Sequence, residues 1–272
     1  HLSIRRQRQM CIRDREALLN CPLKAVLGNV AEDPSTEEHL LRGTLAHAFF
    51  EAIGRGMDAE KAKLLVMEAF ERIQDVPQWQ LRFKLDEFSA LLDRAREWAR
   101  QSEVNQELVG VEIPVGVRVR EGVRIGGYMD RLLRDEEGNY LVVDLKTGKN
   151  QPAKKEAEDH VQLMTYQLAL AHGAFDGHQV HDGEGMPRQG GVLVYPGATT
   201  KKIGEIWQSD KSPEALEEFA ALLPPLVEEM RGPRITARTN KDCDKCPIRS
   251  ICPVQEEGRM TTCLLYTSDA AD

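Results

Sequence analysis

The spacing of hydrophobic residues changes near residue 106, and this change divides the chain into two kinds of structure. Apolar residues recur every three or four positions across 40–53, 58–74 and 84–102, which is the spacing of helices with one buried face. Asp58 is a candidate N-cap for the second helix, and Pro77 separates that helix from the third. The first part of the chain is therefore predicted to form a helical layer.

The second part alternates apolar and polar residues, which is typical of half-buried strands. The alternation runs through 111–119, turns at Glu121-Gly122, continues through 123–133, turns again at 135–139 and ends with 140–146. Because turns this short join antiparallel neighbours, we expect a meander of three strands.

A helix, a strand and a last helix are expected after the meander, at 160–172, 191–195 and 213–230. The segment 173–190 between them is rich in glycine, histidine and aspartate, and we expect it to be a variable or disordered loop. The whole pattern predicts an α/β fold, in which a mixed sheet with an antiparallel meander is flanked by helices.

Length and composition are sufficient for one large domain or two small ones around a substantial core, because the chain has 272 residues and is 41% hydrophobic. No apolar run approaches the roughly 18 to 20 residues that span a bilayer, and the first residues lack the apolar stretch of a signal peptide. We therefore expect a cytoplasmic protein with no membrane partner.

The two ends differ from the rest of the chain and resemble translated sequencing adapters. Residues 1–15 hold five arginines and one aspartate, and residues 263–272 hold two aspartates, so without both ends the net charge changes from −8 to −10. We expect adapter-derived tails; a genuine basic arm and acidic tail is the alternative. The acidity indicates weak unaided affinity for nucleic acid. The remaining residues are expected to form one domain with a helical part, a core and a Cys-rich closure, at 16–105, 106–232 and 233–262.

Two aspartates on the meander are expected to face each other. Asp130 and Asp144 lie at equal distances from a turn centred on residue 137, and paired positions of a hairpin keep a constant sum. Their Cβ atoms are therefore expected to lie about 5 Å apart. Lys146 follows Asp144 by two residues, so both side chains point to the same face of the strand.

These carboxylates are candidate ligands for Mg²⁺ or Mn²⁺. An aspartate within the apolar run 141–145 is costly unless its charge is offset, and hard divalent cations prefer oxygen ligands. The alternative is a buried Asp144–Lys146 ion pair without chemistry. His47 lies one helical turn before Glu51, and Gln162 lies one turn before Tyr166. Taken alone, a histidine such as His47 is more often a core residue than a metal ligand, and the second pair is typical of an ordinary helix face.

Four cysteines form a second candidate site. Cys243, Cys246 and Cys252 follow a C-x₂-C-x₅-C spacing, and Cys21 lies far upstream. Because disulfides are rare in a reducing compartment, a four-thiolate metal site is the better interpretation. Tetrahedral sulfur suits either Zn²⁺ or an iron-sulfur cluster, and the spacing leaves both open, although zinc sites usually take their ligands as two close pairs.

Four short motifs resemble the RecB-type branch of the PD-(D/E)XK nuclease superfamily. They are Gly43-Thr-Leu-Ala-His47, Gly127-Tyr-Met-Asp130, Asp144-Leu-Lys146-Thr-Gly and Gln162-Leu-Met-Thr-Tyr166. The resemblance implies a restriction-endonuclease-like core in which His47, Asp130, Asp144 and the Leu145 carbonyl bind the metal. It further implies that Lys146 is the catalytic lysine and that Gln162 and Tyr166 lie near the DNA. Asp144 stands where the branch usually has a glutamate.

The one-plus-three arrangement of cysteines resembles the iron-sulfur nucleases related to AddB, AdnB and the CRISPR-adaptation nucleases. That resemblance implies a [4Fe-4S] cluster on Cys21, Cys243, Cys246 and Cys252, with Zn²⁺ as the alternative, which staples the N-terminal part to the C-terminal loop. The residues 242–259 resemble the C-terminus of AdnB-type helicase-nucleases.

The expected function is therefore a metal-dependent DNA exonuclease domain, part of a helicase-nuclease that acts on double-strand breaks. Its partners would be single-stranded DNA ends and a helicase motor in the same chain or in a partner subunit. The chain has no G-x-x-x-x-G-K-[ST] phosphate loop of its own. A free-standing CRISPR-adaptation-like exonuclease and a non-catalytic DNA-binding or scaffold subunit are the alternatives.

Overall fold

The computed structural model of the chain describes residues 10–11, 14–28, 35–149, 151, 153, 157–197, 202–231 and 235–258. Most of the two expected adapter-derived ends lies outside these residues. Within the first of them, β1 (Met10–Cys11) pairs with the strand β3 in parallel. No helix among the described residues is long and apolar enough to cross a membrane.

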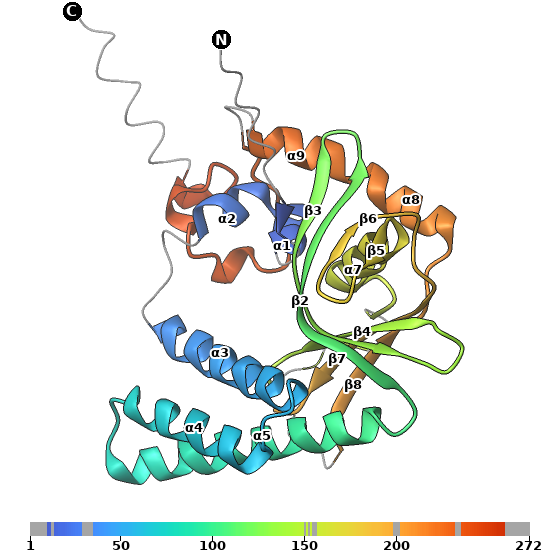
Figure 1. Ribbon diagram of the computed structural model, residues 1–272. Coiled ribbons are helices and arrows are strands. Elements are labelled where there is room, and N and C mark those ends of the chain that lie inside the picture. Colours follow the sequence, from blue (N-terminus) through green and yellow to red (C-terminus); the bar gives the residue numbers. More distant parts are fainter. Residues whose placement is uncertain are drawn as a thin grey trace, which may run out of the picture.

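Three helices form the predicted N-terminal layer, on the lower left of Figure 1. They are α3 (Ser35–Gly54), α4 (Ala59–Arg72) and α5 (Gln78–Ser102). Asp58 caps α4 as predicted, because its side chain accepts a hydrogen bond from the Lys61 amide at 2.9 Å. The helices α3 and α5 begin earlier than their apolar patterns indicated. The ring centroids of Phe70 and Phe88 lie 4.3 Å apart in the core of this layer.

The sheet is mixed, as predicted, and the meander forms its centre. The strand order is β5-β6-β2-β3-β4-β7-β8, and β1 pairs with β3 off this path. The neighbours β2–β3 and β3–β4 are antiparallel, and β7 runs parallel to β4. The bounds are β2 (Glu107–Arg120), β3 (Val123–Arg134), β4 (Tyr140–Leu145), β5 (Gly173–Phe175), β6 (Val180–Asp182), β7 (Arg188–Tyr195) and β8 (Gly204–Gln208).

The register of the β3–β4 hairpin is the one expected from its turn. Arg131 pairs with Val143 and Leu132 pairs with Val142, which is the constant sum that the turn at residue 137 predicts. Gly138 adopts φ +90°, a conformation that glycine tolerates in such a tight turn. The ladder ends at the Arg131–Val143 pair, and Asp130 and Asp144 are the next residues on the two strands.

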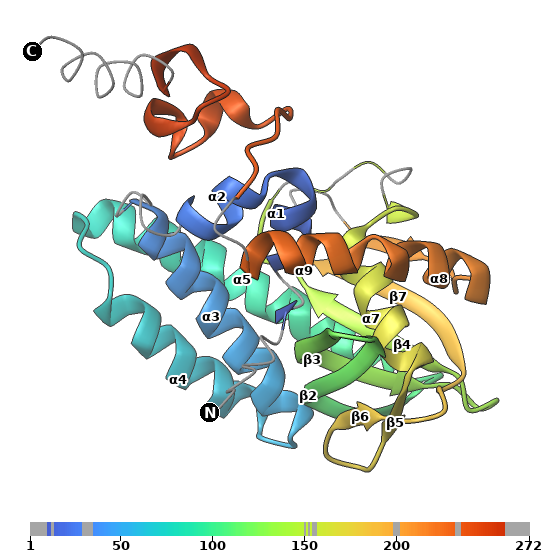
Figure 2. The same ribbon diagram turned by 90° about the horizontal axis from the view of Figure 1, so that it is seen from above.

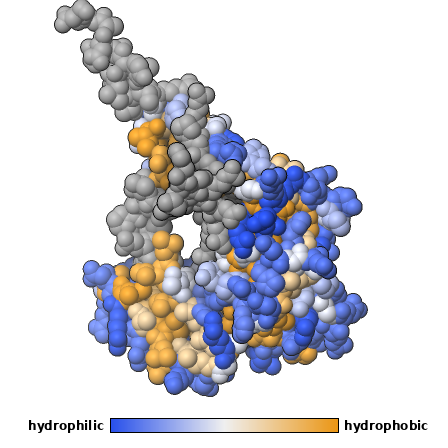
Figure 3. Space-filling model, turned by 45° about the horizontal axis from the view of Figure 1, so that its top comes forward, coloured by the Kyte–Doolittle hydropathy of each residue, from blue (hydrophilic) through white to orange (hydrophobic). Residues whose placement is uncertain are grey.

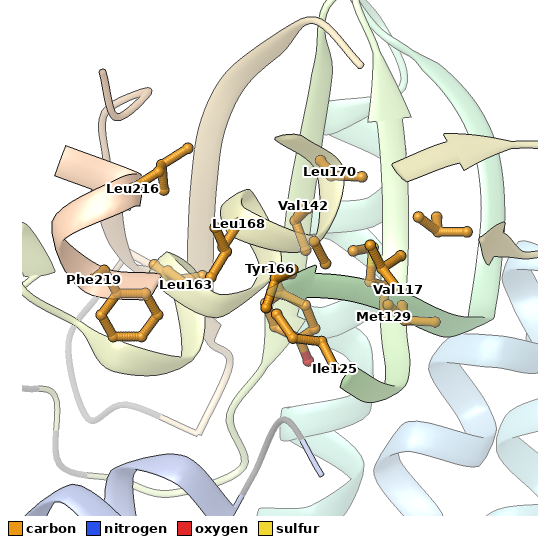
Figure 4. Packing of buried hydrophobic residues seen from close by; sticks show 14 of the residues in the cluster. Val117, Ile125, Met129, Val142, Leu163, Tyr166, Leu168, Leu170, Leu216 and Phe219 are labelled. Atoms are coloured by element: carbon orange, nitrogen blue, oxygen red, sulfur yellow. The ribbon is translucent and has the colours of Figure 1, made fainter. Parts of the chain in front are cut away.

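The helices α7 (Val161–Ala171), α8 (Pro213–Ala221) and α9 (Leu223–Arg231) cover the other face of the sheet (Figure 2). Figure 4 shows Tyr166 of α7 among Ile125, Met129 and Leu163 in this core. The single helix expected at 213–230 is wrong: it is interrupted at Leu222. Pro224 and Pro225 follow the interruption, and proline provides no amide hydrogen to continue a helix.

The expectation of a disordered loop at 173–190 is also wrong. The strands β5 and β6 form a hairpin, and β6 pairs in parallel with β2 through Val115–Val180 and Gly116–His181. The side chain of Asp182 accepts a hydrogen bond from the Arg118 amide at 2.6 Å. Backbone hydrogen bonds between strands and side-chain hydrogen bonds therefore stabilise this segment, although its sequence has no hydrophobic periodicity.

The cysteine-rich end packs against the short helices α1 (Asp14–Asn20) and α2 (Pro22–Leu27), and Figures 1 and 2 show the two side by side. The Leu23 amide donates to the Thr236 carbonyl at 3.1 Å. Two 3₁₀ turns, Cys243–Lys245 and Arg249–Ile251, are followed directly by Cys246 and Cys252. The two ends of the described chain thus meet beside the sheet.

Candidate active site

Asp130 lies at the centre of the site, in the middle of β3, and is 3% exposed. Its Oδ2 accepts a hydrogen bond from the Leu145 amide of β4 at 2.8 Å. The same oxygen lies 3.2 Å from His47 Nδ1 on α3. The structure therefore brings a helix of the N-terminal layer to the carboxylate that was predicted on the meander.

Glu112 of β2 completes this group, and the sequence analysis missed it. It lies opposite Asp130 across the β2–β3 ladder, between the pairs Val111–Arg131 and Ile113–Met129. Ligand atoms of His47, Glu112 and Asp130 all lie within 4.8 Å of one another. Glu112 has φ +46°, a left-handed conformation that is costly for a residue with a side chain. Such strain is often found at functional sites.

Asp144, Lys146, Gln162 and Tyr166 form a continuous network beside this group. Lys146 Nζ lies 2.7 Å from Asp144 Oδ2 and donates to Gln162 Oε1 at 2.5 Å. The amide nitrogen of Gln162 donates to Asp144 Oδ1 at 2.5 Å and to the Tyr166 hydroxyl at 3.1 Å. Every polar atom of the Gln162 side chain is therefore used to fix the aspartate, the lysine and the tyrosine.

The Tyr166 hydroxyl also ties the network to the strand that carries Asp130. It lies 3.1 Å from the Tyr128 carbonyl and 3.2 Å from Asp144 Oδ1. Burial raises the pKa of Tyr166 well above its ordinary value, and the negative charges of Asp144 and Asp130 raise it further. Tyr166 therefore remains a hydrogen-bond donor throughout the physiological pH range.

The charge balance of the site is negative. Burial raises the pKa of Asp144; Lys146 opposes this shift and Asp130 adds to it. Like charges in a buried site repel each other more strongly than in water. Glu112, Asp130 and Asp144 carry three formal negative charges and Lys146 one positive charge, which leaves −2 on these four side chains.

His47, Glu112, Asp144 and Lys146 line one open hollow between α3 and the sheet, with a volume of about 660 Å³. Leu145 and Lys146 line it where β4 ends, and His47 lines it from α3. Gly43 brings α3 close to this end of β4, because a Cβ at Gly43 would lie 3.4 Å from Thr147 Oγ1. A hollow of this size admits part of a nucleotide rather than only a water molecule.

The donor set fits a divalent cation. Carboxylate oxygens and an imidazole nitrogen suit Mg²⁺ or Mn²⁺, and a charge of +2 balances the −2 of the site. His47, Glu112 and Asp130 are close enough to share one ion. Asp144 lies on the neighbouring strand β4, beside the group formed by His47, Glu112 and Asp130. It pairs with Lys146.

The four predicted cysteines also converge. Cys21, Cys243, Cys246 and Cys252 line one small pocket together with Lys24, Arg238 and Arg249. Two backbone amides point at sulfur, from Arg238 to Cys21 Sγ at 3.5 Å and from Asn240 to Cys243 Sγ at 3.3 Å. Thiolates that bind metal are stabilised by such donors and by nearby cations.

Three comparisons with known proteins gave the following results. The family model of the PD-(D/E)XK nuclease superfamily matches residues 13–253. Among solved structures, one titled "Crystal structure of SSO0001" is 16% identical, with a TM-score of 0.41, and the match covers 93% of this chain and 89% of that chain. No curated protein matches. Because the family model spans most of the chain, the protein belongs to the PD-(D/E)XK nuclease superfamily.

Proposed function

We propose that this protein hydrolyses phosphodiester bonds of DNA with the help of Mg²⁺ or Mn²⁺. The observation that carries the proposal is the open hollow lined by His47, Glu112, Asp144 and Lys146, with Asp130 buried directly beside His47 and Glu112. A superfamily of nucleases and a site with two excess negative charges both favour this reaction.

In this proposal His47, Glu112, Asp130, Asp144 and the Leu145 carbonyl hold the cation. A bound divalent cation would offset the charge on the phosphate and make a water molecule a better nucleophile. Lys146 has three N–H donors, of which two go to Asp144 and Gln162. The third orients the attacking water or donates to a phosphate oxygen.

Gln162 and Tyr166 are positioning residues in this proposal. The Gln162 side chain keeps Lys146 and Asp144 in place, and Tyr166 fixes Gln162 and Asp144 from the core side of the sheet. Because each is at least 95% buried, they keep the reacting groups oriented before substrate binds, which lowers the barrier.

We further propose that the domain is of the RecB type and works as an exonuclease on single-stranded ends. The four motifs of that branch and the cysteine pattern support this assignment. A helicase motor, in the same chain or in a partner subunit, would then supply the single strand during repair of double-strand breaks. The net charge of −8 agrees with a need for such a partner, because it weakens unaided binding to DNA.

The cysteine pocket is proposed to hold a [4Fe-4S] cluster rather than Zn²⁺. Four thiolates of a zinc site would lie about 3.8 Å apart, given zinc–sulfur bonds of about 2.3 Å. Among the described residues, no three cysteines have their sulfur atoms within 4.8 Å of one another, whereas ligand atoms of His47, Glu112 and Asp130 do lie that close together. The wider spacing favours a cluster, which is larger than a single ion.

The test is a cleavage assay with end-labelled single-stranded and duplex DNA, in Mg²⁺, in Mn²⁺ and in a chelator. We expect cutting that requires the metal and that falls by at least about 100-fold in Asp130→Asn and Lys146→Met. Asp93→Asn, which removes an exposed carboxylate paired with Lys63 on the helical layer, serves as the matched control. An inactive wild type with normal melting would support a scaffold subunit instead. An Asp144→Ala variant that cuts as fast as the wild type would show that the cutting does not come from this site.

A further inference from the structure

A second hollow adjoins the candidate active site and has a similar volume of about 660 Å³. It shares Glu51 and Glu112 with the first hollow, so the two meet at the group formed by His47, Glu112 and Asp130. The far wall of the second hollow comes from Tyr128 of β3 and from Phe175, Gly177 and His178 of the β5–β6 hairpin.

An exposed aromatic ring distinguishes this hollow from its neighbour, in which the lining Tyr195 is buried. Tyr128 is 59% exposed although it lies only two residues from the buried Asp130. Its carbonyl accepts a hydrogen bond from Tyr166, so its backbone is held in place while its ring faces solvent. A large ring kept exposed beside a reactive site is a surface available for stacking.

Hydrogen bonds hold the part of the wall that the β5–β6 hairpin provides. Asp176 Oδ1 accepts hydrogen bonds from the amides of His178 and Gln179, both at 2.8 Å. Asp182 anchors the other end of the hairpin to Arg118 and Arg124 of the meander. These hydrogen bonds hold the hairpin that carries Phe175 and His178 in place. Binding of a flat ligand in the hollow therefore requires little further ordering of the protein.

The charge of the hollow excludes a second phosphate site. Among the residues that line it, Arg55 alone is an arginine or lysine. Its Nε lies 2.8 Å from Glu51 Oε1. Glu112 adds a further negative charge. The part of a nucleic acid that suits an aromatic wall without free cations is the base rather than the phosphate.

We propose that the second hollow binds one unpaired nucleobase of the DNA next to the phosphate that is cut, with Tyr128 as its stacking surface. This inference rests on the proposed nuclease function and deepens it. The first hollow would hold the scissile phosphate, and the strand would cross Glu112 into the second. Because bases of a duplex are paired and stacked on one another, such a hollow selects single-stranded DNA at the site itself.

The experiment measures binding without catalysis. The full chain, in a chelator, is titrated into a fluorescent single-stranded oligonucleotide of mixed sequence and into the matching duplex. We expect Tyr128→Ala to weaken single-strand binding by about 5- to 100-fold, which is the loss of one base–aromatic stack, without changing duplex binding. Trp79→Ala is the matched control, because Trp79 is a 77% exposed aromatic residue that lines neither hollow.

Tyr128→Trp keeps the test decisive if the alanine variant fails to fold. A larger ring stacks more strongly, so this variant is expected to bind the single strand at least as tightly as the wild type, and its added indole fluorescence is expected to be quenched by the DNA. Equal single-strand binding by folded Tyr128→Ala and wild type, or an unquenched indole in Tyr128→Trp, would overturn the inference.

Its failure is distinguishable from that of the proposed function. Metal-dependent cutting with no effect of Tyr128 on single-strand binding refutes the base-binding hollow and leaves the nuclease intact. A loss of single-strand binding in Tyr128→Ala, in a protein that cuts nothing with any metal, refutes the nuclease and leaves the hollow.

Discussion

Asp130 Oδ2 accepts a hydrogen bond from the Leu145 amide at 2.8 Å, so the carboxylate of one strand replaces a backbone acceptor of the sheet. The same side chain therefore has a structural task and a proposed catalytic one. Substitutions that keep or remove its acceptor oxygen separate the two.

Asp130→Ala should lose stability as well as metal binding, whereas Asp130→Asn should lose only the metal. The asparagine oxygen can still accept from the Leu145 amide, but alanine leaves that buried donor without a partner, at a cost of about 1 to 3 kcal/mol. Urea unfolding in a chelator measures the free energy of unfolding of both variants. Equal stability of the two would refute a structural role for this hydrogen bond.

The conformation of Glu112 makes glycine the more stable replacement. At φ +46° alanine keeps the strain of the left-handed conformation, and glycine removes it. We expect metal-free Glu112→Gly to be more stable than Glu112→Ala by about 1 kcal/mol, the reverse of the order in ordinary strands. Both variants should bind Mn²⁺ more weakly than the wild type by calorimetry. A more stable alanine variant would show that the strain is not significant.

Metal affinity should fall as the pH is lowered, and it should do so above the range of an ordinary aspartate. Burial raises the pKa of Asp144, so protons compete with the cation at pH values where an exposed aspartate is fully ionised. The raised pKa also means that ionised Asp144 destabilises the metal-free fold at neutral pH, a cost that disappears as the pH falls through the folded pKa.

Calorimetric titration with Mn²⁺ between pH 5 and pH 8, in two buffers of different ionisation enthalpy, reports both affinity and protons released. Asp144→Asn removes the titrating group and should flatten the dependence that Asp144 contributes. An affinity that is constant over this pH range in the wild type would contradict the prediction.

Tyr166→Phe should reduce cutting by about tenfold and the free energy of unfolding by about 1 kcal/mol. The ring keeps its place in the core, but Asp144 and Gln162 lose a shared partner. Tyr140→Phe is the matched control, because its hydroxyl interacts with Arg134 at the far end of the hairpin. Single-turnover cleavage and urea unfolding give the two quantities, and unchanged cleavage in Tyr166→Phe would argue against a positioning role.

Cys252→Ser should lower the melting temperature by more than about 5 °C and remove iron from the anaerobically purified protein, because metal binding at such sites contributes to folding. Cys263→Ser changes a cysteine outside the proposed site and should do neither. Visible absorbance together with iron and zinc analysis of both proteins provides the readout. One zinc per chain and no iron would replace the cluster by the zinc site.

The sequence predicted the β3–β4 half of the site because that hairpin is regular. Its turn alone fixes which residues face each other, and the ladder is regular from Arg134–Tyr140 to Arg131–Val143, directly before the two aspartates. The β2–β3 hairpin is different. Arg120 pairs with Val123, but Arg118 pairs with Arg124, so one residue is bulged out and the register shifts by one.

That shift explains why Glu112 was missed. Counting from the turn at Glu121-Gly122 alone would place Glu112 opposite Arg131, whereas the bulge brings it opposite Asp130. The left-handed φ of Glu112 then changes the direction of its side chain. Neither the bulge nor this φ can be recognised from the spacing of hydrophobic residues. The β5–β6 hairpin escaped prediction for a related reason, because polar side chains such as Asp176 and Asp182 hold it in place.

The hydrophobic pattern of the sequence also did not indicate the exposed apolar residues on the helical layer. Figure 3 shows apolar side chains gathered on the helical part of the molecule, at lower left, with mostly hydrophilic residues elsewhere on this face. Among the exposed apolar residues of α4 and α5 are Leu64, Leu65 and Phe83. Periodicity identifies the buried face of a helix, but it does not explain exposed apolar residues on the other face.

The contact between the two ends of the described chain has a consequence for biosynthesis. Arg238 donates a hydrogen bond to the Leu19 carbonyl, 219 residues earlier. During translation, α1 and α2 leave the ribosome long before residues 235–258 exist, and contacts of this sequence separation form slowly. The sheet and α7, against which α1 packs, can therefore become ordered on the nascent chain before the segment that carries Cys252 joins them.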